Sequence, residues 1–287
     1  MTTELKQKTA VVSTIDEIKK ITDSFRGSTI GLVPTMGYLH NGHMNLVKQS
    51  LMKCDHTVVS IFINPRQFSP SEDLDIYPKN LSEDIEKLES IGVDVLFSPN
   101  TDTIYPEGFK TNIQVDGITQ HLCGKSRPDL FKGVATVVLK LFNIVSPQHA
   151  FFGEKDWQQL GVIETMTRDL NIDVHIHRVP LIREPDGLAM SSRNSNLSPE
   201  ERKKALSLSR SLNDSKEKIK QGITSSKQLI QNIKSIITAE PGTQIDYISI
   251  CDPISLEEKQ EVKGRTLIAL AVKIGPARLI DNCIIGD

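Results

Sequence analysis

The chain has 287 residues, enough for one large domain, or a large and a small one, with a core that needs no disulfide or metal. Hydrophobic residues make up 38% and charged residues 24%, and the net charge of −2 disfavours nucleic acid as the main partner. Segment 1–20 is polar, so we do not expect a secretory signal, and no run approaches the ~20 apolar residues of a membrane helix. These features predict a cytoplasmic protein with no membrane partner.

The four cysteines are scattered along the chain and form no C-x-x-C pair. They are Cys54, Cys123, Cys251 and Cys283. This distribution favours a reducing compartment and buried small side chains over a disulfide framework or a structural zinc site.

The first 180 residues alternate between short apolar runs and amphipathic segments. Runs rich in β-branched residues predict buried strands at 29–33, 57–63, 93–97, 149–152 and 174–179. Apolar residues at helical spacing predict helices at 42–53, 80–91, 132–145 and 155–170. This order predicts an α/β, Rossmann-like domain with a mainly parallel sheet. Since ligands bind at the carboxyl ends of such strands, we expect the loops after the first, second, fourth and fifth strands to carry the chemistry.

The pattern changes after about Arg183. Ser198-Pro199-Glu200-Glu201 is a capping box with proline at the first helical position, and it predicts a lysine-rich helix that ends near residue 220. Further elements predicted here are a helix at 225–238 and strands at 245–250 and 265–272. We therefore predict a Rossmann-like domain over 1–184 and a smaller α+β C-terminal domain over 185–287, which would close as a lid.

The segment 34–43 joins the first predicted strand to its helix and reads PTMGYLHNGH. Gly37 permits a sharp turn, and Gly42 leaves room for a ligand. A helix N-terminus presents N–H groups and a positive dipole end to phosphate, where His40 and His43 can donate hydrogen bonds as pyrophosphate leaves. A zinc site fits less well, because the two histidines lack the i,i+4 spacing of a helical metal pair.

The H-x-G-H pattern resembles the signature of the nucleotidylyltransferase superfamily. The longer strings resemble the motifs of the pantothenate synthetase family, in the same order, and the resemblance runs from about residue 25 to residue 285. The strings are VPTMGYLHNGH, SIFINPRQF, SRP, FKGVAT, FGEKDWQQL and REPDGLAMSSRN. The resemblance implies an ATP-dependent ligase that activates pantoate as an acyl-adenylate and joins it to β-alanine, with Mg²⁺ as cofactor and unknown metal ligands. It also implies a homodimer formed through the larger domain.

The resemblance implies that four segments bind ATP. Their residues are Met36, Gly37, Tyr38, Leu39, His40, Asn41, Gly42, His43, Gly153, Glu154, Lys155, Asp156, Ile182, Met190, Ser191, Ser192 and Arg193. Asp156 suits the ribose hydroxyls, and the Ile182 backbone would contact adenine. The catalytic role falls on His43, His40, Lys155, Ser192 and Arg193. His43 is the candidate for proton transfer, and a role in hydrogen bonding alone stays open. The loop 190–194 is a candidate lid over the reactive anhydride.

The implied substrate-binding residues are Gln67, Gln159, Asn64 and Arg127. Amide side chains both donate and accept, which suits the hydroxyls of pantoate, and Gln67 would also lie near β-alanine. Arg127 would contact the second substrate or the adenylate. Because Gln158 and Gln159 are adjacent, one of them is expected to be solvent-exposed, and the resemblance selects Gln159 as the binding residue.

Three positions depart from the common family pattern, and two other functions compete. Asn41 and Cys123 stand where acidic residues are frequent, and Leu130 replaces a frequent histidine. One alternative is an adenylyl-transferring ligase for another acid or amine. The other is a nucleotide-binding regulator that has lost catalysis, against which the histidine pair, Lys155 and the 191–193 segment argue.

Overall fold

The computed structural model describes residues 8–68 and 77–286 and divides the chain into two compact units. Unit 1 comprises residues 1–115, 129–154 and 162–180, and unit 2 comprises 116–128, 155–161 and 181–287. The division is discontinuous along the chain, whereas the predicted domains were contiguous; a boundary after residue 184 stays a prediction.

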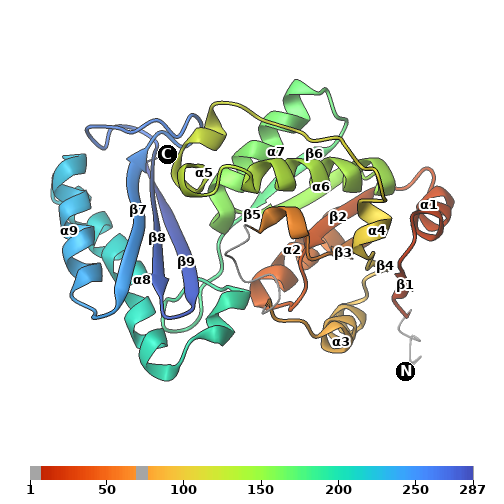
Figure 1. The fold of residues 1–287 in the computed structure, drawn as a ribbon, viewed down its shortest axis with the longest axis horizontal. Helices are drawn as coiled ribbons and strands as arrows, with labels where there is room; N and C mark the ends of the chain where they lie inside the picture. Colours follow the sequence, from red (N-terminus) through yellow and green to blue (C-terminus); the bar gives the residue numbers. More distant parts are fainter. Residues whose placement is uncertain (1–7, 69–76, 287) are drawn as a thin grey trace. The chain divides into compact units, whose positions relative to one another are not determined.

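Unit 1 contains a six-stranded, fully parallel sheet with strand order β1-β4-β3-β2-β5-β6 (Figure 1). The strands are β1 (Ala10–Val12), β2 (Ile30–Thr35), β3 (His56–Ile61), β4 (Val95–Phe97), β5 (His149–Gly153) and β6 (His175–Val179). All five predicted strands are confirmed, and β1 is an addition that pairs with β4. Thr35 at the end of β2 pairs with Ile61 at the end of β3, so the loops after these strands leave the sheet at the same edge.

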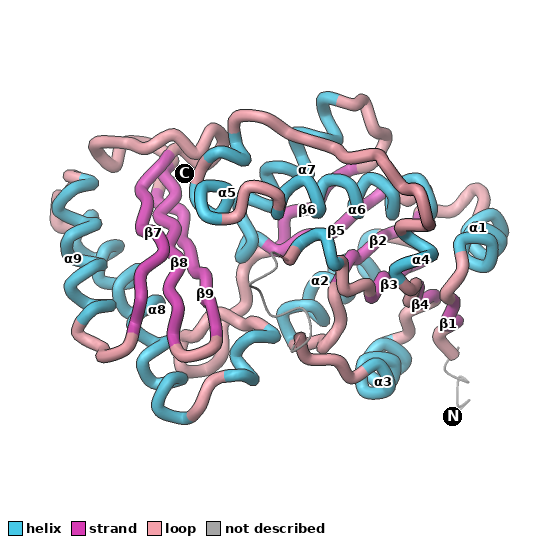
Figure 2. The backbone as a smooth tube through the Cα atoms, in the orientation of Figure 1, coloured by secondary structure: helices cyan, strands magenta, loops and turns pink. Residues whose placement is uncertain are grey.

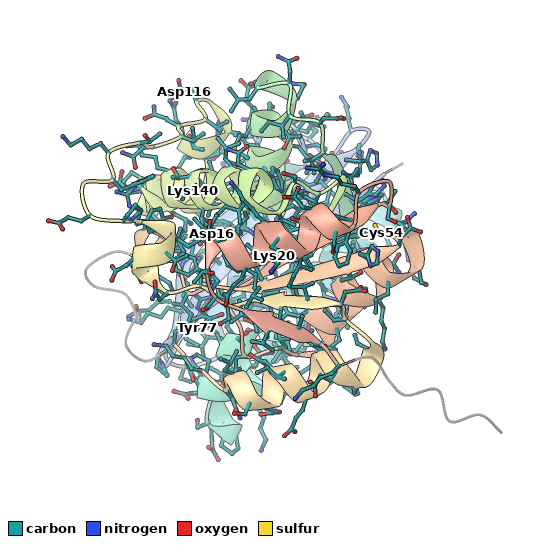
Figure 3. All side chains as sticks on the ribbon, turned by 90° about the vertical axis from the view of Figure 1, so that its right-hand side faces the viewer. Asp16, Lys20, Cys54, Tyr77, Asp116 and Lys140 are labelled. Carbon is teal, nitrogen blue, oxygen red and sulfur yellow. The ribbon has the colours of Figure 1, made fainter. Side chains whose placement is uncertain are left out.

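Helices accompany the strands, as the alternating pattern predicts. They are α1 (Ile15–Ser24), α2 (Asn41–Lys53), α3 (Leu81–Ile91), α4 (Thr101–Ile104), α6 (Leu130–Val145) and α7 (Trp157–Asp169), with 3-10 turns η1 (Pro65–Gln67) and η3 (Glu154–Asp156). The helix α1 was not predicted, although a Thr14–Glu17 capping box starts it. Its Asp16 and Lys20 are exposed (Figure 3), while Ile18 is fully buried. A buried cluster from β2, β3, α2 and α3 packs beneath the loops that follow β2 and β3.

Unit 2 contains an antiparallel sheet of order β7-β8-β9, packed against two helices (Figure 2). Its elements are η2 (Ile118–Gln120), α5 (Leu122–Ser126), η4 (Ser192–Asn196), α8 (Pro199–Lys220), α9 (Ser226–Thr238), β7 (Thr243–Cys251), β8 (Thr266–Ile274) and β9 (Ala277–Ile285). The predicted capping box starts α8, where Ser198 accepts from the Glu201 N–H. The strand β9 was not predicted. The α/β fold with a small second sheet is thus confirmed. Within the described ranges, no helix is both long and apolar enough to cross a membrane.

Candidate active site

The histidine loop, residues 36–43, follows β2 and ends in the first turn of α2. His40 is the N-cap of this helix, and its Nδ1 accepts a hydrogen bond from the Gly42 N–H at 3.1 Å. His43 Nδ1 in turn accepts from the His40 N–H at 3.4 Å, and the two rings stack with centroids 4.0 Å apart. The predicted histidine pair is therefore a reciprocal capping box built from imidazoles in place of serine and glutamate.

These hydrogen bonds indicate which nitrogen of each imidazole ring carries the proton. A neutral imidazole that accepts at Nδ1 carries its proton on Nε2. Both rings therefore hold an Nε2–H donor, and a donor is what a phosphate oxygen requires. Asn41, the first residue of α2, is exposed, and Gly42 and His43 are half-buried beside it.

A residue missed by the sequence analysis, Asp84 of α3, fixes the turn before the histidines. Gly37 and Tyr38 both have positive φ, +83° and 52°, and a Cβ on Gly37 would lie 2.9 Å from Ile61 Cγ2. The Asp84 carboxylate accepts from the N–H groups of Tyr38 and Leu39, both at 2.7 Å. Asp84 is 1% exposed, and burial raises its pKa against the opposing effect of these hydrogen bonds. No local sequence signal connects residue 84 to residues 38 and 39.

The segment after β3 holds Asn64 and Gln67. Asn64 is fully buried, and its Nδ2 donates to Gln67 Oε1 and to the Gly133 carbonyl, both at 3.0 Å. Its Oδ1 accepts from the Arg66 N–H at 3.2 Å and the Tyr105 hydroxyl at 3.0 Å. The amide thus makes four hydrogen bonds inside the protein, which suits a residue that orients Gln67. Direct contact of Asn64 with substrate stays a prediction.

The close approach of α6 to this segment explains a glycine in the FKGVAT string. A Cβ on Gly133 would lie 2.2 Å from the Arg66 carbonyl oxygen. Arg66 also lies over the Tyr105 ring at 4.8 Å, and burial raises the pKa of Tyr105 to about 12. Gln67 is half-buried at the end of this rigid turn.

The predicted residues Gly153 to Asp156 follow β5, where Glu154 begins η3. Gly153 ends the strand, and a Cβ built on it would meet no atom within 4 Å, so the backbone there is open to a ligand. In unit 2, the Lys155 ammonium lies 3.7 Å from Asp156 Oδ1, and the Lys155 carbonyl accepts from Asn282 Nδ2 at 2.9 Å. The Lys155 side chain is 18% exposed, which differs from an ordinary surface lysine.

The segment 182–194, which we call the serine–arginine loop, is a small hairpin in unit 2. The Met190 N–H donates to the Ile182 carbonyl at 3.0 Å, and Arg183 bridges Ala189. Ser191 is half-buried and caps η4 by accepting from the Arg193 N–H at 3.3 Å, and Ser192 is 7% exposed. Residues 191–193 therefore lie in an ordered turn in which Ser192 is buried and Ser191 and Arg193 are half-buried.

Buried charges missed by the sequence analysis hold this hairpin. Arg183 makes two hydrogen bonds of 2.8 Å to Asp281 of β9, which is 2% exposed. Burial lowers the pKa of Arg183, but the Asp281 hydrogen bonds and charge outweigh that effect and raise it. Glu184 accepts from Asn194 Nδ2 at 2.7 Å and from Arg202 of α8 at 2.6 Å. The REPDG string shows one arginine and two acidic residues, but their partners, Asp281 and Arg202, lie outside the string and no local signal links them.

The expectation for the glutamine pair was wrong. Gln158 is 5% exposed and Gln159 is half-buried, so neither is a solvent-exposed residue. Gln158 points to the segment that carries Arg127, and its contacts are described below. Arg127 itself is half-buried at the end of α5.

Cys123 lies in a polar cluster of unit 2. Its Sγ is 3.4 Å from Arg278 Nη2 and 3.5 Å from the Tyr247 hydroxyl. Arg278 also binds Asp246 at 2.6 Å. In this chain, Arg278 therefore pairs with an acidic residue of β7, Asp246, while position 123 is a cysteine. Leu130, the other departure in that region, begins α6 and is half-buried.

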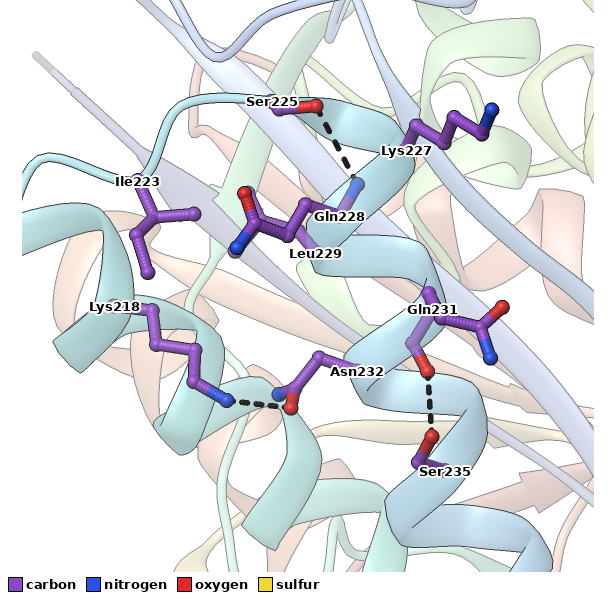
Figure 4. A pocket seen from close by; sticks show the side chains of 9 residues that line it. All are labelled: Lys218, Ile223, Ser225, Lys227, Gln228, Leu229, Gln231, Asn232 and Ser235. Carbon is purple, nitrogen blue, oxygen red and sulfur yellow. Dashed lines mark hydrogen bonds between the residues drawn. The ribbon is translucent and has the colours of Figure 1, made fainter.

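Two further observations bear on ligands. Across the residues that the structure describes, no group of three His, Cys, Asp or Glu side chains is placed to hold a metal ion. A hollow of about 530 Å³ runs along α8 and α9 of unit 2 (Figure 4), and none of the predicted site residues lines it.

Comparisons with known proteins show which family this chain resembles. The family model described as pantoate–β-alanine ligase matches residues 10–284. A pantothenate synthetase of Acetivibrio thermocellus is 53% identical over 96% of this chain and 99% of its own length. One from Geobacter sulfurreducens is 52% identical over 91% of this chain and 92% of its own length.

Solved structures give the same result. The crystal structure of pantothenate synthetase from Thermus thermophilus has a TM-score of 0.91 at 43% identity, covering 96% of this chain and 98% of that one. A pantoate–β-alanine ligase from Francisella tularensis, solved as a complex with β-γ ATP and β-alanine, has a TM-score of 0.81 at 37% identity, over 96% and 97% of the two chains. This chain belongs to the pantoate–β-alanine ligase family.

Proposed function

We propose that this chain joins pantoate to β-alanine at the expense of ATP, giving pantothenate, AMP and pyrophosphate through a pantoyl-adenylate. The names of its relatives support the two substrates, and the Francisella complex with β-γ ATP and β-alanine supports ATP. The observation that carries the proposal is the histidine loop. Each imidazole accepts a hydrogen bond at Nδ1, which supports an Nε2–H donor on each ring, and the N-terminus of α2 is a position that suits a polyphosphate.

In the first step, a pantoate carboxylate oxygen attacks the α-phosphorus of ATP, and the bond from that phosphorus to the bridging oxygen breaks to release pyrophosphate. The protein needs no nucleophile, so catalysis consists of positioning and charge stabilisation. We assign His40, His43, Lys155, Ser192 and Arg193 to the developing negative charge on the phosphates. Asp156 would bind the ribose, and Ile182 the adenine through its backbone.

In the second step, the neutral β-alanine amine attacks the anhydride carbon, the carbon–oxygen bond breaks, AMP leaves, and the attacking nitrogen releases one proton to water as the amide forms. We propose Gln67 and Gln159 as the groups that hold pantoate, with Asn64 behind Gln67, and Arg127 as a contact of the second-step substrate. The Nδ1 contact of His43 supports a donor role at Nε2 over a base role. Proton transfer by His43 stays a prediction.

Magnesium would enter with ATP. Mg²⁺ in nucleotide enzymes takes phosphate oxygens and keeps several waters. The donors of the serine–arginine loop are hydroxyls and a guanidinium, which suit phosphate, so we assign no residue as a metal ligand. When bound, the ion would neutralise charge on the phosphates. A cytoplasmic location and a homodimer also stay proposals; light scattering should give twice 32.0 kDa for the dimer.

The test is exchange of labelled pyrophosphate into ATP in the absence of β-alanine. We expect exchange with pantoate and Mg²⁺, and pantothenate only after β-alanine is added. A panel of 2-hydroxy acids and of amines distinguishes a ligase for other substrates. ATP binding without any exchange would favour a nucleotide-binding regulator.

A further inference from the structure

The segment 117–127 of unit 2 leads to Arg127 and needs outside support. His121 is the N-cap of α5 but makes no side-chain cap hydrogen bond. Leu122 has a φ of 42°, a left-handed conformation that is strained for a residue with a side chain and persists only where its surroundings hold it. A five-residue helix cannot supply that support by itself.

The side chain of Gln158, in the first turn of α7, supplies what is missing. Its Oε1 accepts from the Cys123 N–H at 3.0 Å and so caps α5. Its Nε2 donates to the carbonyls of Ile118 at 2.9 Å and His121 at 2.7 Å. The amide thus hydrogen-bonds to the backbone on both sides of Leu122, at His121 and at Cys123. All of this lies within unit 2.

Two close contacts leave this segment little freedom to move. A Cβ on Gly124 would lie 1.7 Å from the Thr119 carbonyl oxygen, so η2 and α5 touch at the backbone. A Cβ on Gly161, one turn after Gln158, would lie 2.6 Å from Ile118 Cδ1. The start of α7 therefore packs directly on the segment that Gln158 binds.

Arg127 is connected to this amide through the α5 backbone. The Arg127 N–H donates to the Cys123 carbonyl at 2.9 Å, and the Cys123 N–H donates to Gln158. Loss of the amide would release the first turn of α5, and the release would shift the residue at its other end. The hydrogen bond from Gln158 and the main-chain bond that places Arg127 therefore meet at the same residue, Cys123.

We propose that Gln158 is a positioning residue, which acts through α5 to hold Arg127 for the second step; the inference rests on the proposed function. An amide is required because the site offers one N–H and two carbonyl oxygens. Glutamate would direct an oxygen at the two carbonyls, and methionine would fill the volume without bonds. Consecutive residues of α7 would then serve the two substrates, Gln159 for pantoate and Gln158 through Arg127 for β-alanine.

A double-mutant cycle tests the proposal. The measured quantity is kcat/KM for β-alanine, at saturating ATP and pantoate, for the wild type, Q158M, R127A and the double variant. We expect Q158M to lose about tenfold in the wild-type background, the scale of one or two lost hydrogen bonds, but less than about twofold when Arg127 is already alanine. Equal losses in both backgrounds would overturn the proposal, as would wild-type kinetics in Q158E.

A matched control separates positioning from general loosening of unit 2. Asn232 of α9 hydrogen-bonds to Lys218 of α8 (Figure 4) and to Asp214 of the same helix, and neither bond involves residues 116–128. We expect N232L to lower the melting temperature as Q158M does, yet to keep kcat/KM for β-alanine. A comparable loss in N232L would refute positioning by Gln158. A wild-type protein that forms no pantothenate would instead refute the proposed function itself.

Discussion

The two phosphate-binding regions proposed here are built in different ways. The histidine loop is mainly local, because His40 and His43 cap one another's backbone within four residues, and Asp84 is the distant side chain that holds its turn. The serine–arginine loop is held by side chains distant in sequence, Asp281 of β9 and Arg202 of α8. A sequence motif can therefore be recognised in both regions. Only in the histidine loop does the motif itself contain most of the side chains that stabilise the loop conformation.

The largest effect is expected from His43→Ala. The change removes an Nε2–H donor and leaves α2 with its His40 cap, so the fold should persist. We expect pantoate-dependent exchange to fall by at least about 100-fold, the scale of a lost charge-stabilising group. Initial rates at saturating ATP and pantoate, with circular dichroism as the folding control, measure this. A near-native rate would remove His43 from the mechanism.

Asp281→Asn should have the next largest effect, because it tests the long-range support of the serine–arginine loop. Asparagine cannot receive both Arg183 bonds as a carboxylate does, and a buried partner charge is lost. We expect exchange to fall by about 10- to 100-fold through misplacement of the loop. Asp186→Asn is the control, since Asp186 pairs with Arg202 at 2.6 Å near the surface, and it should stay within about threefold. Equal losses in the two variants would contradict the assigned difference.

Asp84→Asn tests the distant support of the histidine loop and should have a smaller effect. The amide would turn an N–H toward one of the two N–H groups that the carboxylate binds, so one hydrogen bond is lost. We expect about a tenfold loss of exchange. Asp94→Asn is the matched control. The Asp94 carboxylate also accepts a hydrogen bond from a main-chain N–H, that of Thr57 at 2.8 Å, and does not touch the histidine loop. Exchange at the wild-type rate in the Asp84 variant would show that the local capping box suffices.

His177 lies outside both loops, and its effect should appear in stability and not in rate. Its ring lies near His149, His175 and Lys53, and burial with these neighbours lowers its pKa to about 4. The unfolded chain then binds more protons than the folded one between about pH 6.5 and 4, so stability falls as the pH falls through that window. His177→Gln should flatten this dependence in denaturant titrations while pyrophosphate exchange stays unchanged. An unaltered pH profile would contradict the assignment.

Elements with strong periodicity were predicted from the sequence. Elements were missed where the segment is short or where a local signal was not used. The strands β2 to β6 and the helices α8 and α9 are confirmed within a few residues. The strand β1 has three residues, too few for a periodic signal. By contrast, the Thr14–Glu17 capping box of α1 was legible in the sequence, whereas β9 buries Asp281 and so lacks a simple apolar–polar alternation.

The motifs of the candidate site could be predicted from the sequence, but the hydrogen bonds from distant residues that hold these motifs in place could not. Strings around His40, Lys155 and Ser192 are contiguous, so resemblance finds them. Asp84, Asp281 and the amide of Gln158 act across gaps of 35 to 98 residues, and no pattern in one sequence links such positions. The two adjacent glutamines show the limit clearly, because helical spacing did not reveal that one amide is buried and the other half-buried.

The central claim is that the acid is activated on the α-phosphate of ATP. Pantoate labelled with ¹⁸O in its carboxylate tests it directly, by mass spectrometry of the products after complete turnover. The carboxylate oxygen that attacks phosphorus stays with AMP when the amine displaces it. The account predicts one ¹⁸O in each AMP and none in pyrophosphate. Unlabelled AMP, with the label in another phosphate product, would contradict it.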